Sequence, residues 1–147
     1  MLNLTQFPII TLSKTINVLI PANTPAGTSI FLPYDAEINN SVLKGVKVSL
    51  ANYDVAILIN GINVIDEEDI RRFYISLSNN NEQKIIDDFP LNGLTSLSST
   101  NNRTIRRYNC VIDLAKSFLK LNDDLTAAVG IDSFIPITFY YKPLNWK

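Results

Sequence analysis

The stretch KTINVLIPANTPAGTSIFLP, residues 14–33, contains two short apolar segments that are separated by a turn. Within Lys14–Ile20, isoleucine or valine stands at every second position from residue 16 onward, which predicts a strand with one buried face. Pro21–Gly27 holds two prolines and a glycine and predicts a loop. Thr28–Leu32 predicts a second short strand, which ends where Pro33 removes a backbone donor.

Short apolar segments recur along the rest of the chain and predict further strands. In the first of them Val42, Val46 and Val48 fall on one face and Leu43 on the other. Asn60-Gly61 directly follows an apolar run and predicts a hairpin turn. The segments are Val42–Leu50, Asp54–Ile59, Arg72–Ser78, Lys84–Phe89, Ile105–Ile112 and Phe134–Lys142.

Three segments leave more than one interpretation open. Asp113–Leu121 fits a helix face or a continued strand, and we favour the strand. Pro136 lies inside the last predicted strand and suggests a sheet edge or a bulge. Pro90–Asn102 is a long polar segment, whose length predicts a functional or interface loop.

About eight short strands without an internal repeat predict an all-β fold, an antiparallel β-sandwich. Eight strands is also the number in a single jelly roll, and an immunoglobulin-like topology is the alternative. Residues 1–13 predict an extended N-terminal arm, because Phe7-Pro8 favours an extended chain there. Residues 14–147 then form one domain, a normal size for a single core.

The composition argues against most enzyme classes. The 147 residues include no histidine, the side chain that most often transfers protons near neutral pH. Cys110 is the single cysteine, and because the chain has no histidine, none can activate its thiol. The apolar neighbours of Cys110 predict that it is buried. Lys116-Ser117 is adjacent but lacks the spacing of a serine–lysine dyad, and the five glycines fit no nucleotide-binding motif. We therefore predict no enzyme activity, no catalytic or metal residues and no cofactor.

Two charged groups have alternative interpretations. The run Asp66, Glu67, Glu68 and Asp69 offers oxygen ligands for calcium, but it lacks the EF-hand spacing, and a solvated turn or a short helix is favoured. The arginines stand as Arg71-Arg72 and as Arg106 with Arg107, near Arg103. They are suited to phosphate or DNA contact, to ion pairs with residues 66–69 across a subunit interface, or to isolated surface positions. We favour the last two.

Six aromatic residues lie in predicted strands, where alternation sends about half of them into the core. Tyr140 and Tyr141 must point to opposite faces, so one of the two is a surface candidate for stacking on a sugar or a base. The six are Phe73, Tyr74, Tyr108, Phe139, Tyr140 and Tyr141.

Charge and hydropathy restrict the expected partners. The formal net charge is −1, so the whole chain gives no strong nucleic-acid signal. The first cation is Lys14, and the N-terminus therefore does not resemble a signal peptide. No segment reaches the ~18 apolar residues of a membrane-spanning helix.

A resemblance adds to these observations. The apolar arm, the asparagine-rich body, PANTPAGTSIFLP at 21–33 and FIPITFYYKP at 134–143 resemble small bacteriophage virion proteins. The chain resembles single jelly-roll capsid proteins, such as the vertex (penton) proteins beside double jelly-roll coats in tailless phages. It is also similar to auxiliary head proteins of tailed phages.

The resemblance implies a symmetric homo-oligomer that contacts other capsid proteins, with a spike or receptor as a further partner. It also implies a place in the virion after synthesis in the host cytoplasm, and it assigns no site residue. The alternatives are an auxiliary or decoration head protein and a carbohydrate- or receptor-binding β-sandwich module, which polar loops and spare aromatics would suit. A hydrolase with a carboxylate mechanism is the least favoured hypothesis.

Overall fold

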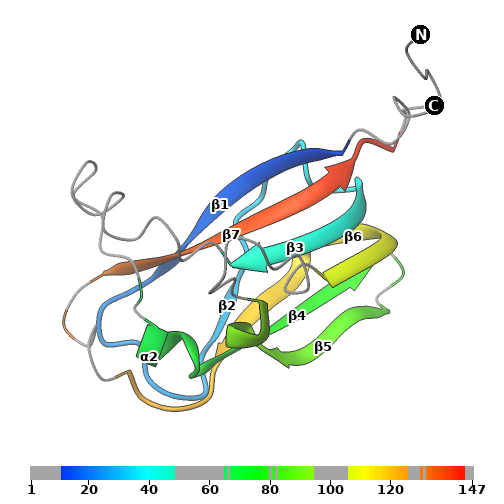
Figure 1. Cartoon of the computed structure of the whole chain (residues 1–147). Coiled ribbons are helices and arrows are strands. Elements are labelled where there is room, and N and C mark those ends of the chain that lie inside the picture. The colour runs from blue at the N-terminus through cyan, green and yellow to red at the C-terminus, as the bar shows by residue number, and fades with distance from the viewer. Residues whose placement is uncertain are drawn as a thin grey trace, which may run out of the picture.

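The computed structural model describes residues 11–48, 65, 67–79, 81, 83–94, 106–125, 130 and 132–144, with side chains except at 67, 68 and 106–109. These residues form an all-β structure with one helical turn and one 3-10 turn (Figure 1). The strands are β1 (Leu12–Ile20), β2 (Ser29–Phe31), β3 (Val42–Val48), β4 (Phe73–Asn79), β5 (Lys84–Pro90), β6 (Arg106–Leu121) and β7 (Ser133–Lys142). The turns are α2 (Glu67–Ile70) and η2 (Leu91–Leu94).

The seven strands are joined in one main antiparallel sheet with the order β1-β7-β3-β6-β4-β5, and β2 pairs with β6. β6 belongs to both halves of this sheet, of which one contains β1, β7 and β3 and the other contains β2, β4 and β5. Its first part, up to Val111, pairs with β3, and its second part, from Ile112, pairs with β4 and β2. Figure 1 shows β6 turning back on itself at one end of the molecule, so that β1, β7 and β3 lie over β4 and β5.

Just beyond this turn, a bulge in the second part of β6 is stabilised by the strand's own polar side chains. The register between β4 and β6 shifts between Ser76 and Ser78, where β6 has three more residues than its partner. The hydroxyl of Ser117 accepts a hydrogen bond from the backbone N–H of Ser78 at 3.1 Å and donates one to the carbonyl of Asp113 at 2.8 Å. The Asp113 carboxylate accepts from the N–H of Ala115 at 3.1 Å. The strand prediction for Asp113–Leu121 is confirmed, and these bonds explain its mixed pattern.

One hydrophobic core lies between the two halves. The alternate residues of β1 that were predicted to be buried, Ile16, Val18 and Ile20, pack in the same cluster as Phe73 of β4 and Phe139 of β7. Both phenylalanine side chains are completely buried. Burying a side chain of this kind stabilises a fold by about 1.5–3 kcal/mol, so the alternation in the strands is the main determinant of this structure.

The predicted faces of β3 are wrong at the two residues before its bulge. Val42 was placed on the face of Val46 and Val48, but it is half-buried and pairs in register with Lys142, which faces away from the core. Leu43 was placed opposite Val46 and Val48, yet all three side chains are fully buried. The register of β3 with both of its neighbours shifts between Leu43 and Gly45. A β-bulge there adds one residue, Lys44, and returns the leucine to the core side of the strand.

Three boundaries also differ from the prediction. β1 begins at Leu12, which packs against the core, so the predicted arm 1–13 overlaps the domain by at least two residues. β7 lies between β1 and β3, so Pro136 is not on an edge strand, and its pairing with β1 has no bulge. Residues 90–94 of the predicted loop belong to β5 and η2.

The other strand predictions are confirmed with small shifts at the ends. The predicted strand Asp54–Ile59, the Asn60-Gly61 turn, residues 1–10 of the arm and residues 95–102 of the long loop lie outside the described residues.

Candidate functional site

A polar cluster fastens the β2–β3 connection to the end of the sheet. The ammonium of Lys14 in β1 lies 2.8 Å from a carboxylate oxygen of Asp35 and 3.3 Å from one of Glu37. The hydroxyl of Tyr141 in β7 donates to the other Glu37 oxygen at 2.9 Å. Asp35 also accepts from the N–H groups of Glu37 and Ile38 at 2.9 and 3.2 Å, so its carboxylate orders the turn itself.

Three groups of this cluster have shifted pKa values. The hydrogen bond to Asp35 raises the pKa of Lys14. Burial acts to raise the pKa of Asp35, but hydrogen bonds from Lys14 and from two backbone N–H groups outweigh it, and the pKa is lowered. Burial and the hydrogen bond to Glu37 raise the pKa of Tyr141. None of these shifts moves a group toward neutral pH, so the cluster is suited to holding the loop in place and not to proton transfer.

Carboxylates at the opposite end of the molecule have a similar role. Asp132 accepts from the N–H of Ala22 at 2.7 Å, and Asp124 accepts from the N–H of Ala26 at 3.1 Å. Both bonds hold the connection between β1 and β2, where Gly27 adopts a φ of 91°. These carboxylates replace backbone partners that an irregular loop does not have.

Glu67, Glu68 and Asp69 of the acidic run lie in the short helix α2, as one of the two favoured interpretations predicted. The side chain of Asp69 is fully buried, and one of its oxygens lies 3.2 Å from Nε of Arg72. The ion pair that was considered between subunits is thus formed within the chain for these two residues. Asp66 and the side chains of Glu67 and Glu68 lie outside the described residues. Within the described part of the chain, no group of three or more His, Cys, Asp or Glu is placed to hold a metal ion.

The two candidate nucleophiles lie in different environments. Cys110 is exposed, so the prediction that it is buried is wrong. It lies in the first part of β6, which pairs with β3 alone among the described strands, and a residue at such a margin lacks a covering neighbour. Ser117 is fully buried and bonded to backbone groups on both sides, so it serves the bulge in β6.

The aromatic residues divide as alternation predicts. Phe73, Phe139 and Tyr141 are buried, and Tyr140 is the half-buried residue of the tyrosine pair, as is Tyr74 on its own strand. The side chain of Tyr108 lies outside the described residues.

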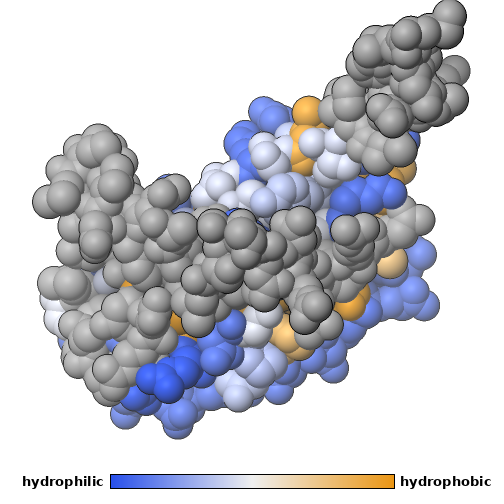
Figure 2. All heavy atoms as spheres, viewed as in Figure 1, coloured by the Kyte–Doolittle hydropathy of each residue, from blue (hydrophilic) through white to orange (hydrophobic). Residues whose placement is uncertain are grey.

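Sequence reasoning missed the most exposed aromatic residues. Phe31 is 59% exposed and Tyr34 is 72% exposed. The ring of Phe31 lies 5.6 Å from that of Phe118, and the ammonium of Lys84 lies 4.9 Å from the Phe118 ring centre. β2 has only three residues, too few for an alternation that would mark Phe31 as outward. On the face drawn in Figure 2, hydrophobic described residues show only as small separate areas.

Arg106 and Arg107 begin β6, where they pair in register with Val46 and Gly45 of β3. Their side chains and Arg103 lie outside the described residues.

Comparisons of this chain with protein-family models, with curated proteins and with solved structures found no match. Among the described residues, no helix is long and apolar enough to cross a membrane.

Proposed function

We propose that this chain is a non-enzymatic structural subunit of a viral shell, a capsid or vertex (penton) protein with a single jelly-roll fold. The subunit assembles with copies of itself and contacts neighbouring coat proteins. Its place is the virion, after synthesis in the host cytoplasm. The observation that carries the proposal is the nested order in which the strands pair.

A jelly roll is a ribbon of eight antiparallel strands in which the first pairs with the last, the second with the seventh and so on inward. Here β1 pairs with β7, β2 with the second part of β6, β3 with the first part of β6, and β4 with β5. Each pair lies inside the previous one along the chain. Under the proposal, β6 supplies two of the eight strands without an intervening loop, and the two strands meet between Val111 and Ile112, where the pairing changes from β3 to β4.

A fold does not define a function, so the proposal also rests on what the polar groups do. The described carboxylates Asp35, Asp124 and Asp132 accept backbone hydrogen bonds, and Asp69 is paired with an arginine. This arrangement suits a rigid building block better than a site for chemistry. β1 is the last strand at one end of the sheet order and offers an edge to which a neighbouring chain can add.

In this proposal the N-terminal arm adds to the sheet edge of a neighbouring subunit. Removal of residues 1–10 tests that role, because it leaves all of β1 in place. The arm has isoleucines at positions 9 and 10 that a neighbour's sheet edge would bury. We expect the truncated chain to keep its circular dichroism spectrum and its melting temperature but to form fewer or smaller assemblies in analytical ultracentrifugation. Unchanged assembly of the truncated chain would remove the arm from the proposal.

The exposed ring of Phe31 favours a second candidate function, a carbohydrate- or receptor-binding module. A decoration protein that binds a host glycan belongs to this class. Phe31 is available to stack on a sugar ring, its own ring lies against that of Phe118 in the paired strand β6, and the ammonium of Lys84 lies over the ring of Phe118. Saturable binding on a glycan array that is lost in Phe31→Ala and kept in the control Leu19→Ala would favour this function. No binding to any glycan would leave the shell subunit as the better proposal.

A further inference from the structure

Positive charge is concentrated in one half of the sheet. β1, β3, β7 and the part of β6 up to Val111 contain no Asp or Glu. All 14 acidic residues of the chain therefore lie elsewhere, although the formal net charge of the whole is only −1. The cations in these strands are Lys14, Lys44, Lys47, Arg106, Arg107 and Lys142.

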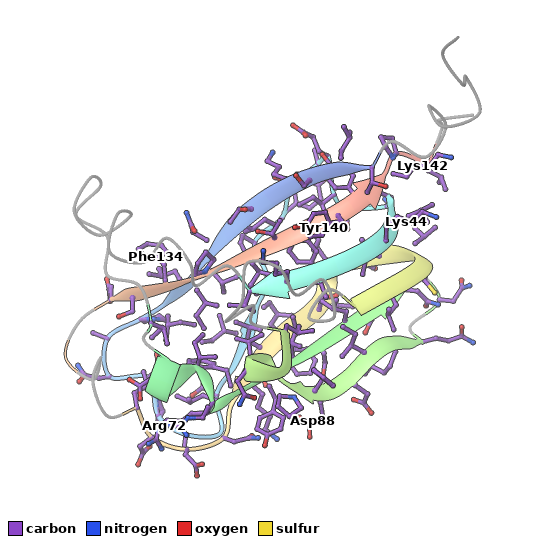
Figure 3. The ribbon with its side chains drawn as sticks, viewed as in Figure 1. Lys44, Arg72, Asp88, Phe134, Tyr140 and Lys142 are labelled. Carbon is purple, nitrogen blue, oxygen red and sulfur yellow. The ribbon has the colours of Figure 1, made fainter. Side chains whose placement is uncertain are left out.

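Three of these lysines lie on the side of the half-sheet that faces away from the core. Lys44 and Lys47 of β3 are half-buried, whereas the side chains of Leu43, Val46 and Val48 are fully buried in the core. Lys142 of β7 pairs in register with Val42 of β3, and Lys47 pairs with Thr138. Figure 3 shows Lys44 and Lys142 close together at one end of the two strands. Lys14 is not one of this group, because it pairs in register with Phe139 and therefore lies on the core-facing side of the sheet.

An aromatic side chain lies among the lysines. Tyr140 is half-buried and follows Phe139, whose side chain faces the core, so the tyrosine lies on the outward side of β7. Its partner across β3 is Gly45, which adds no side chain to that row. Lys142 lies two residues after Tyr140 on the same face of β7. Lys47 pairs in register with Thr138, two residues before Tyr140. On β6, the residue in register with Gly45 is Arg107.

We propose that this surface, defined by Lys44, Lys47, Tyr140 and Lys142 and named the basic face, binds single-stranded nucleic acid. The lysines contact phosphate groups, and Tyr140 offers a ring on which a base stacks. Phosphate is favoured because the strands of this half contribute no carboxylate to repel it. A single strand is favoured over a duplex because only unpaired bases can reach a tyrosine on a sheet surface. The proposal does not depend on the shell function.

Fluorescence anisotropy with a labelled oligothymidylate tests the basic face on the full chain. The triple variant Lys44→Gln, Lys47→Gln, Lys142→Gln should bind at least tenfold more weakly. The slope of log K against log salt should become less negative by roughly 2, since each lost single-strand phosphate contact contributes about 0.7. The matched control is Lys120→Gln, an exposed lysine in the second part of β6, which should bind like the wild type. Thermal melts establish that each variant is folded.

Tyr140→Leu separates stacking from charge. We expect it to weaken binding about tenfold with the salt slope unchanged, because stacking is worth about 1–3 kcal/mol per base. A duplex of the same length should bind more weakly than the single strand. Equal binding of duplex and single strand, together with no effect of Tyr140→Leu, would overturn the assignment to single strands.

Two outcomes would overturn the proposal entirely. One is an equal loss of binding in the Lys120→Gln control. The other is no oligonucleotide binding by the wild type at low salt. If the triple variant then also has a changed native mass, the basic face is assigned to a contact with the acidic loops of a second copy.

Discussion

Ser117 holds the bulge of β6 through both functions of its hydroxyl, and its removal has a calculable cost. The side chain is completely buried. Ser117→Ala takes away the acceptor of the Ser78 N–H and the donor to the Asp113 carbonyl, and it opens almost no cavity. A buried backbone group without a partner costs about 1–3 kcal/mol. Since a carbonyl can keep a second partner, we expect a loss of about 2 kcal/mol.

Ser133 provides the control because its hydroxyl is equally hidden but does nothing comparable. It is 1% exposed, and its oxygen has no hydrogen-bond partner among the described residues. Ser133→Ala removes a hydroxyl whose burial is uncompensated, so we expect unchanged or slightly increased stability.

Urea unfolding followed by circular dichroism measures both variants. With an m value of about 2 kcal/mol/M, the midpoint of Ser117→Ala should fall by roughly 1 M while m stays constant. A midpoint within experimental error of the wild type would refute the role given to this hydroxyl. Equal losses in the two variants would show that burial alone, and not hydrogen bonding, determines the effect.

Further predictions concern the polar cluster, the exposed thiol and one glycine. Asp35→Asn should lose less than about 1 kcal/mol because it keeps an acceptor for the turn and loses only an ion pair, whereas Asp35→Ala should lose roughly 1–2 kcal/mol more in the same urea assay. In melts against pH, the lowered pKa of Asp35 means that its contribution is present above the ordinary value of 3.8 and is lost as pH falls through the folded value. The raised pKa of Tyr141 means that its contribution is present below 10.0 and is lost as pH rises through the folded value, so a Tyr141→Phe variant with an unaltered alkaline limb would contradict this. Cys110 should react with a thiol reagent in the native protein as fast as in urea, and protection would contradict its exposure. Gly27→Ala should cost about 1 kcal/mol through its positive φ alone, because nothing lies within 4 Å of the added methyl group; a neutral effect would contradict the turn geometry.

Alternation predicted the strands because burial of every second side chain is the dominant local signal in a sheet. It succeeded for β1, where Ile16, Val18 and Ile20 are all buried. It failed at Leu43, because a bulge changes the phase of a strand without leaving a mark in hydrophobicity. A bulge depends on the neighbouring strands, which are distant in sequence.

The candidate sites were less predictable than the fold. The pairing of Asp69 with Arg72 follows the i,i+3 spacing of a helical turn and could have been anticipated from the sequence. The exposure of Cys110 could not, since it depends on which strands lie beside β6. The net charge of the chain does not reveal that lysines are concentrated on one half of the sheet. This concentration becomes visible only when β3 and β7 are known to be neighbours.

The native mass of the purified chain, measured by light scattering with and without EDTA, tests the proposed shell subunit most directly. We expect a discrete oligomer such as a trimer or pentamer, since closed cyclic symmetry is the natural result of one repeated contact. EDTA should leave that mass unchanged, because Asp69 is buried beside Arg72 and is not available to calcium. A monomer at all concentrations would contradict self-assembly and favour the glycan-binding module. Dissociation in EDTA would contradict the assignment of Asp69 and return calcium to residues 66–69.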